Sequence, residues 1–298
     1  MQDEWKTVAK NSRDIQYEMP GSLLKIKNVG INGFRFPISN FSDDRIKYSG
    51  ARVRATVDIP QKMRGANMSR TTIGLIQSIS DAKRIEDLAS IMAERILSAH
   101  EYSVNSRVAI RGEGFLYTES PVSYLDSIER FVLSERAIRA RDGNENSMLG
   151  VTVTGISTCP CGAELMRTKL ESHVDKITPT HMQRARLGLF IDFYGKPQAN
   201  VNDLLDAAYQ SMSGSVYSTL KRADEAFVIY NSLKNTKFVE DIYRTAINAI
   251  HMKLAGLDGV KAVYARAESF ESIHGYNAVA SGWLDWKTIE KSAKISGQ

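Results

Sequence analysis

The chain has 298 residues, of which 43% are hydrophobic and 24% are charged, and its formal charge at pH 7 is +5. This length suits two domains of ordinary size, and this balance is typical of a soluble globular protein. No apolar stretch approaches the roughly 18 residues of a membrane span, and the amino terminus lacks the apolar run of a signal peptide, so we expect a cytoplasmic protein that binds no membrane.

The surplus of positive charge and the spacing of the two cysteines indicate which ligands and which covalent bonds to expect. A modest basic excess suits an anionic ligand such as a nucleotide. We expect no nucleic-acid partner, because the sequence has neither a dense Lys/Arg run nor an RNA-binding aromatic signature. Cys159 and Cys161 are separated by one residue, a spacing that disfavours an ordinary structural disulfide.

Alternation between apolar and polar residues predicts several β-strands. In residues 51–59 every odd position is apolar and every even one polar, which indicates a half-buried strand ending at Pro60. Residues 127–142 fit a helix or a strand. Further strands are predicted at 105–118, from Val151 to Cys159-Pro160, at 186–194, and after Gly259 through Val260, Val263, Phe270 and Ile273.

Helical spacing of apolar residues predicts three helices. The first carries Ile85, Leu88, Met92 and Ile96; the second covers 204–212 with Asn202 as a plausible N-cap; the third covers 239–254 and ends at Gly256. Because the strands follow one another without regular helical crossovers, we expect an α+β protein with a mainly antiparallel sheet.

Two similar tetrapeptides suggest an internal duplication. Each half has a strand, a proline, the tetrapeptide Asn67-Met68-Ser69-Arg70 or His181-Met182-Gln183-Arg184, an apolar segment read as a strand, and an amphipathic helix. We therefore predict an N-terminal segment (1–45), a first module (46–150) and a second module (151–298).

Residues able to perform chemistry gather in the second half of the sequence. Cys159-Pro160-Cys161-Gly162 offers a soft ligand or nucleophile on a tight turn, although a pair of small buried hydrophobes is an alternative. His181 stands in the second tetrapeptide, and Glu271 and His274 could converge near the end of the last strand. One thiolate, two imidazoles and spare carboxylates suit Zn²⁺ or Fe²⁺ with an open position for water. His100 and His251, at predicted helix ends, are more consistent with a structural role.

Through these and further short motifs the chain resembles the type IB GTP cyclohydrolase family, including its archaeal MptA branch. The matching segments are short but numerous and in the same order. They are 29–31 (VGI), 36–38 (FPI), 64–70 (RGANMSR), 159–161 (CPC), 181–184 (HMQR), 221–225 (KRADE), 238–241 (FVED) and 268–274 (ESFESIH).

The resemblance implies tandem tunnelling-fold (T-fold) modules, antiparallel sheets backed by helices, assembled into an oligomeric barrel. The homo-oligomer, a dimer or tetramer, would have its sites between subunits. One divalent metal per subunit is implied, with Fe²⁺ preferred over Mn²⁺ or Zn²⁺. By the same resemblance the metal would be bound by Cys159 and His274, with further ligands among His181, Glu225 and Glu271.

The resemblance also implies roles toward GTP. Glu240 matches the glutamate that anchors the purine, because a carboxylate accepts both the N1–H and the 2-amino hydrogens of guanine. Cys159 and His181 would act in catalysis, with His181 carrying a proton. Arg70 and Arg184 are candidate phosphate contacts.

Two departures from the bacterial pattern favour the archaeal branch: Asn67 stands where bacterial members have His, and the loop between Cys161 and His181 is longer. That branch converts GTP to 7,8-dihydroneopterin 2′,3′-cyclic phosphate, formate and pyrophosphate in pterin biosynthesis of the methanopterin or folate-like type. A bacterial-type enzyme giving 7,8-dihydroneopterin triphosphate is the alternative.

Two rivals belong to other classes. A nitrile reductase of queuosine synthesis has the same fold, but its Glu-Ser-[Leu/Lys]-Lys segment is missing at 268–271 (ESFE). A non-catalytic nucleotide-binding T-fold protein gives no reason for Cys159, His181, Glu240 and His274 to occur together.

Overall fold

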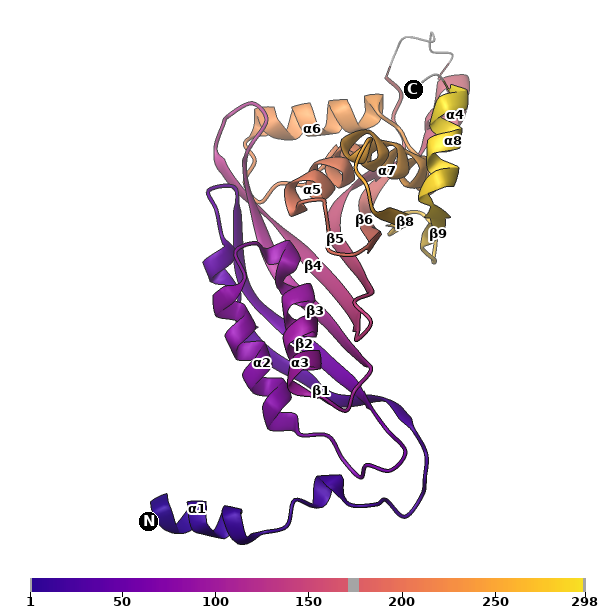
Figure 1. Cartoon of the computed structure of the whole chain (residues 1–298). Helices are drawn as coiled ribbons and strands as arrows, with labels where there is room; N and C mark the ends of the chain where they lie inside the picture. Colours follow the sequence, from indigo (N-terminus) through magenta and orange to yellow (C-terminus); the bar gives the residue numbers. More distant parts are fainter. Residues whose placement is uncertain (1, 171–176, 297–298) are drawn as a thin grey trace.

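The computed structural model describes residues 2–170 and 177–296. Its centre is one antiparallel sheet with the strand order β1-β2-β3-β4-β5-β6-β8-β9 (Figure 1). The long strands are β1 (Ile26–Pro37), β2 (Ile46–Ile59), β3 (Asn105–Glu119), β4 (Asp126–Ala140), β5 (Glu145–Thr158), β6 (Met182–Tyr194), β8 (Val260–Ser269) and β9 (Ala278–Asp285), and the short β7 (Gly214–Ser215) pairs with β5. The predicted α+β class with an antiparallel sheet is confirmed.

Two helix pairs cover the same face of this sheet. Helix α3 packs on β3 and β4, α5 on β5, and α7 on β8. Leu133 of β4 and Val151 of β5 lie directly opposite each other and are fully buried, so the helices of both halves share one hydrophobic core. The helices are α1 (Gln2–Asn11), α2 (Met68–Asp81), α3 (Leu88–Ala99), α4 (Pro160–Lys169), α5 (Val201–Gln210), α6 (Arg222–Lys234), α7 (Val239–Leu254) and α8 (Trp286–Ser296).

Short 3₁₀ helices and the chain ends complete the molecule. The 3₁₀ helices are η1 (Ile15–Tyr17), η2 (Ser39–Phe41) and η3 (Ile85–Asp87). Helix α1 buries no side chain and lies apart from the sheet in Figure 1. In the two described ranges, none of the helices combines the length and apolar character that crossing a bilayer requires.

Most predicted elements are present, and three local predictions need correction or completion. The ambiguous segment 127–142 is strand β4, with alternate residues buried. Asn200, not Asn202, caps α5, because its side chain accepts the Asp203 backbone N–H at 2.9 Å. The last predicted strand ends at Ser269, so Phe270 and Ile273 lie in the loop after it. Gly256, at φ 81°, follows α7 as predicted.

The pairing of the two tetrapeptides is wrong. Asn67 caps a helix: its side chain accepts the Arg70 backbone N–H at 3.2 Å, and residues 68–81 are helical, not an extended segment. The buried positions Thr71, Leu75 and Ser78 repeat at helical spacing, a signal that the β-branched residues around them obscure. His181, in contrast, stands directly before strand β6.

A different repeat is present. The order β1-β2-α2-α3-β3-β4 recurs as β5-β6-α5-α7-β8-β9, with α4, β7 and α6 inserted in the second half. The sheet is continuous between the halves through the pairing of β4 with β5. The module boundaries at 46 and 151 stay predictions, and position 151 falls inside β5.

Both predicted structural histidines lie at helix ends. His100 is the C-cap of α3 and is fully buried, with Nδ1 2.8 Å from the Ile96 carbonyl and Nε2 3.1 Å from the Asn67 carbonyl. His251 stands in the last turn of α7, and its ring centroid is 5.2 Å from that of Trp286. Neither faces the residues proposed for chemistry.

Candidate functional site

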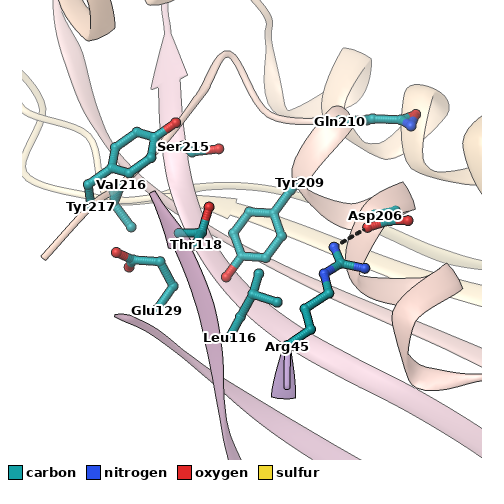
Figure 2. A pocket seen from close by; sticks show the side chains of 10 residues that line it. All are labelled: Arg45, Leu116, Thr118, Glu129, Asp206, Tyr209, Gln210, Ser215, Val216 and Tyr217. Atoms are coloured by element: carbon teal, nitrogen blue, oxygen red, sulfur yellow. Dashed lines mark hydrogen bonds and ion pairs between the residues drawn. The ribbon is translucent and has the colours of Figure 1, made fainter. Parts of the chain in front are cut away.

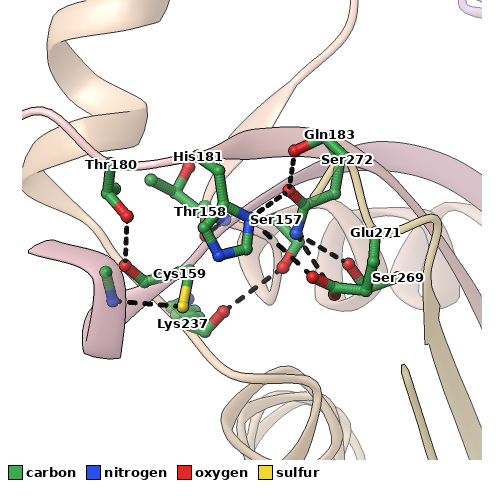
Figure 3. A network of polar contacts seen from close by, with 12 residues as sticks. Ser157, Thr158, Cys159, Thr180, His181, Gln183, Lys237, Ser269, Glu271 and Ser272 are labelled. Carbon is green, nitrogen blue, oxygen red and sulfur yellow. Dashed lines mark hydrogen bonds and ion pairs between the residues drawn. The ribbon is translucent and has the colours of Figure 1, made fainter. Parts of the chain in front are cut away.

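A cavity of about 300 Å³ gathers most of the predicted site residues. Five chain segments supply its lining: the end of β5, the start of α4, the start of β6, the start of α7 and the loop between β8 and β9. The predicted residues that line it are Cys159, His181, Glu240, Glu271 and His274, and Cys161 lines it too. Figure 3 shows how the polar groups around Cys159 and His181 are connected.

Cys159 stands where β5 gives way to α4. Its sulfur accepts the Gly162 backbone N–H at 3.3 Å, as an N-cap of that helix, and Pro160 occupies the first helical turn. The sulfur therefore lies at the positive end of the α4 helix dipole. Gly162 permits this turn because a Cβ there would lie 2.3 Å from Thr180 Oγ1.

The segment that carries Cys159 is hydrogen-bonded to the segment just before β6 that carries His181. The Cys159 N–H donates to the His181 carbonyl at 3.2 Å, and Thr180 Oγ1 donates to the Cys159 carbonyl at 2.9 Å. These two bonds hold together the two segments that carry the sulfur and the imidazole, and both residues line the cavity.

Gln183 orients the His181 ring. Its amide nitrogen donates to Ser269 Oγ at 2.9 Å and to Glu271 Oε1 at 3.3 Å (Figure 3). A carboxylate can only accept, so the amide oxygen must be the atom that faces His181 Nδ1 at 3.0 Å. Nδ1 therefore carries the proton, and Nε2, which has no hydrogen-bond partner among the described residues, keeps its lone pair for a proton or a metal ion.

Two further groups stand close to His181. Glu271 Oε2 is 3.8 Å from His181 Nδ1, and both side chains are almost buried, with exposures of 11% and 13%. The His274 ring lies perpendicular to that of His181 with 6.5 Å between centroids, and it is stacked on Tyr276 at 5.0 Å. Tyr276 thus fixes the plane of a ring that is otherwise exposed on a loop.

Glu240 faces the cavity from the first turn of α7. Its neighbour Asp241 performs the capping, because Asp241 Oδ2 accepts the Phe238 N–H at 3.0 Å. Glu240 forms no hydrogen bond or ion pair with a described residue, which leaves its carboxylate open to a ligand.

Lys237 and Gln183 line the cavity and were not predicted as site residues. Lys237 Nζ donates to the carbonyls of Gln210, Ser211 and Met212 at the end of α5, so its charge serves that helix end. Burial lowers the pKa of Lys237, and Asp241 opposes that shift. Gln183 could have been noticed from the tetrapeptide, but only the fold brings Ser269 and Glu271 to its amide.

Three predicted residues lie elsewhere in the described chain. Glu225 is exposed on α6, where its N–H bonds to the Lys221 carbonyl. Arg70 is in α2, with Nη1 donating to the Ala99 carbonyl at 3.3 Å. Arg184 follows Gln183 in β6, so its side chain points to the opposite face of the sheet.

A second cavity, of about 410 Å³, lies between the two halves (Figure 2). Arg45 closes one side of it through a bond to Asp206 at 2.5 Å, and Tyr209 and Glu129 line its interior. Burial raises the pKa of Glu129. No cysteine or histidine of the described residues lines this cavity, so it lacks the soft donors of the first.

The donors around the first cavity fit a metal ion in kind. Sulfur, imidazole nitrogen and carboxylate oxygen are the ligands of Zn²⁺ and Fe²⁺ sites. Within residues 2–170 and 177–296, no three His, Cys, Asp or Glu side chains converge as a complete ligand set. The metal site, and the part of each predicted ligand in it, therefore stays a prediction.

Comparison with solved structures identifies the fold. A uricase from Arthrobacter globiformis superposes with a TM-score of 0.51 over 89% of this chain and 95% of that one, at 8% sequence identity. A hyper-thermostable mutant of the Arthrobacter uricase gives a TM-score of 0.50 over 89% and 94%. The molecule is thus a tandem tunnelling-fold protein, as predicted, with a Cys/His/Glu-lined cavity in its second half.

Comparison of sequences identifies the family. The profile described as "Type I GTP cyclohydrolase folE2" matches residues 13–280, so the chain belongs to the type I GTP cyclohydrolase family. It is 30% identical over 288 residues to GTP cyclohydrolase MptA of Halobacterium salinarum, covering 90% of this chain and 93% of that protein. It is 28% identical over 305 residues to GTP cyclohydrolase MptA 1 of Methanocella arvoryzae, covering 95% and 97%.

Proposed function

We propose that this enzyme is a metal-dependent GTP cyclohydrolase that produces 7,8-dihydroneopterin 2′,3′-cyclic phosphate with release of formate and pyrophosphate. The observation that carries the proposal is the meeting of Cys159, His181, Glu271, His274 and Glu240 at one cavity in a chain of the GTP cyclohydrolase family. Neither a nitrile reductase nor a non-catalytic binding protein accounts for that combination.

We assign a role to each residue of the cavity. Cys159 and His274 would bind the metal, with His181 or Glu271 as a further ligand. The metal would be Fe²⁺, with Mn²⁺ or Zn²⁺ as alternatives, and it would supply activated water at neutral pH. Glu240 would accept the N1–H and 2-amino hydrogens of guanine. If Glu271 rather than His181 completes the metal ligands, His181, with its proton held on Nδ1 by Gln183, would take up at Nε2 the proton of the attacking water and return it to the purine nitrogen that leaves C8.

The choice of the cyclic phosphate rests on the likeness to relatives named MptA. Asn67 adds less support than its sequence position suggested, because its side chain caps α2. To form the cyclic ester, a ribose hydroxyl attacks the α-phosphorus and expels pyrophosphate, a matter of holding the two atoms in reach.

Product analysis tests this proposal. Anaerobically purified protein is incubated with GTP and Fe²⁺, Mn²⁺ or Zn²⁺, and the products are identified by mass spectrometry together with a pyrophosphate assay. We expect the cyclic phosphate with one pyrophosphate for each formate. Dihydroneopterin triphosphate without pyrophosphate would assign the bacterial-type reaction instead.

We further propose a homo-oligomer, a dimer or tetramer, with Glu225 serving the cavity of a neighbouring subunit. Strands β1 and β9 each pair with a single described strand, and open strand edges favour pairing with another copy. On α6, Phe227 and Tyr230 leave 46% and 56% of their surfaces exposed near Glu225, which suits an interface.

Subunit mixing tests this arrangement. Cys159→Ala and Glu225→Gln should each be inactive as homo-oligomers, while mixed oligomers made by unfolding and refolding them together should recover part of the activity. Activity that stays absent in verified mixed oligomers would place Glu225 outside the neighbour's site.

A further inference from the structure

Three arginines form a row across the open face of the first half. Arg35 of β1 lies directly opposite Arg52 of β2, and Arg52 lies directly opposite Arg111 of β3. We call these three residues the arginine row. They point away from the helices, because the positions that alternate with them, such as Val53 and Ile110, are buried in the core.

Within the described ranges, the side chains of the arginine row have no neutralising partner. None of the three guanidinium groups forms a hydrogen bond or ion pair with a described residue, although the backbones are paired in the sheet. Two other arginines on the same face are engaged: Arg136 pairs with Asp192 at 3.1 Å, and Arg107 donates to the Lys27 carbonyl at 3.0 Å. Arg54, two positions after Arg52, has no side-chain partner among the described residues either, but it does not line the cavity over the row. Like charges directly opposite each other in a sheet are destabilising, so the row has a cost that an anion would remove.

A cavity of about 700 Å³ lies over the arginine row. Arg130 also lines it, and among the described lining residues the single carboxylate, Glu113, is already bonded to Arg130. Gly50, which has no side chain, also lines the cavity and stands at a register shift of β2 against β3. Space, surplus positive charge and unused donors therefore coincide.

We propose that the arginine row and its cavity form a binding site for a polyphosphate chain, separate from the cavity at Cys159. Guanidinium groups bind phosphate oxygens in pairs through a planar fork of N–H donors. Neighbouring strands are about 4.8 Å apart, so the row spans about 10 Å, and a chain of linked phosphates can contact all three members where a single phosphate cannot. A free polyphosphate and the triphosphate of a nucleotide share this chemistry.

Calorimetric titration of the full-length protein with inorganic tripolyphosphate at low ionic strength tests the site. The double variant Arg52→Gln/Arg111→Gln should bind roughly 100-fold more weakly than the wild type, and wild-type affinity should fall as salt is added. The variant Lys10→Gln/Lys83→Gln loses the same charge from two exposed lysines elsewhere and should bind within about twofold of wild type. Equal losses in both variants would reduce the effect to net charge and overturn the proposal.

Thermal unfolding gives a second readout that needs no folded double variant. Without ligand, Arg52→Gln alone should melt no lower than wild type, because it relieves repulsion within the row. Tripolyphosphate should raise the melting temperature of the wild type and do so much less for Arg52→Gln. A ligand-free Arg52→Gln that melts clearly lower would show that the row stabilises the fold by itself, against the proposal.

Further measurements distinguish a free polyphosphate from a nucleotide as the ligand, and both from other partners. In Cys159→Ala, tripolyphosphate binding should persist while cyclohydrolase activity is lost. The two proposals can therefore fail independently of each other. Similar affinities for tripolyphosphate and GTP in that variant identify a free polyphosphate as the ligand, and tighter binding of GTP that is lost with the row identifies a nucleotide. A single-stranded RNA that outcompetes tripolyphosphate, or a row variant that changes the oligomeric state, would overturn the proposal in favour of those partners.

Discussion

The two halves of the molecule each place a glutamate near the start of the helix that precedes their last two strands, α3 in the first half and α7 in the second, and use it differently. In the first half Glu86, just before α3, is buried; its Oε1 accepts the Val201 N–H at 2.9 Å and its Oε2 lies 3.4 Å from Arg84 Nε. In the second half Glu240 is exposed at the cavity, and its carboxylate has no partner among the described residues. One carboxylate joins the halves, and the other is left for a ligand.

The connection between the first two strands also differs between the halves: it is buried in one and lines a cavity in the other. Between β1 and β2 the chain passes through Ile38, which is fully buried. Between β5 and β6 it passes through Cys159 and His181, which line the cavity. The two halves thus repeat the same connection with different side chains: in the first half the side chain is buried in the core, and in the second half the side chains line the cavity.

The largest effect is expected from removing the Cys159 sulfur, which tests whether the metal site lies in the second half. Cys159→Ala should lose bound metal and cyclohydrolase activity together, because a thiolate ligand is replaced by a methyl group. Cys161→Ala should be milder, since its sulfur has no bond to the helix N-terminus. Metal analysis of proteins purified in parallel decides: equal metal in wild type and Cys159→Ala would remove the thiolate from the site.

The next effect tests the contrast between Glu240 and Glu86. Glu240→Gln exchanges one acceptor oxygen for a donor that faces the donors of guanine; an unpaired buried group costs about 1–3 kcal/mol, so GTP affinity should fall about tenfold or more. Glu86→Gln is the matched control and should lower the melting temperature while leaving GTP affinity unchanged. GTP binding measured by calorimetry that is equal in wild type and Glu240→Gln would rule out Glu240 as the anchor.

A smaller effect is expected from Gln183, whose amide orients His181. Gln183→Met keeps much of the volume but removes the acceptor for Nδ1–H, and loss of such a supporting bond typically weakens metal binding about 10–100-fold. Gln198→Met, exposed on the loop before α5, is the control. Metal affinity is measured by competition with a chelator; unchanged affinity in Gln183→Met would mean that His181 is positioned without its amide.

The smallest effect concerns stability in the first half. Burial raises the pKa of Glu135 well above its usual value, and Glu86 and Asp87 add to the shift, although the Ala89 N–H donates to it. A carboxyl with a raised pKa in the folded state stabilises most when protonated, and this contribution is lost as pH rises through that pKa. Glu135→Gln stays neutral, so it should raise the melting temperature by a few degrees at pH 8 and by less at pH 5. A variant that melts lower at both values would contradict this.

Much of this protein was readable from its sequence. Period-2 alternation marked β2, helical spacing marked α3 and α7, and the motifs at 159–161, 181–184, 238–241 and 268–274 indicated the family before any coordinates. These features are local, because the pattern that indicates a strand or a helix face lies within a short run of neighbouring residues. The wrong pairing of the two tetrapeptides has the same cause. Their residues are similar, but one tetrapeptide caps α2 and the other precedes β6, a difference that depends on the surrounding fold.

Only the tertiary structure decided which residues meet. Cys159 and Glu271 are separated by more than a hundred positions, and the pairing of β5 with β6 and of β6 with β8 brings their segments to one cavity. The same registers set Arg35, Arg52 and Arg111 in a row that no motif indicates. The reason is physical: side-chain identity is a property of the sequence, whereas proximity between distant residues depends on strand register and on which face of the sheet is buried.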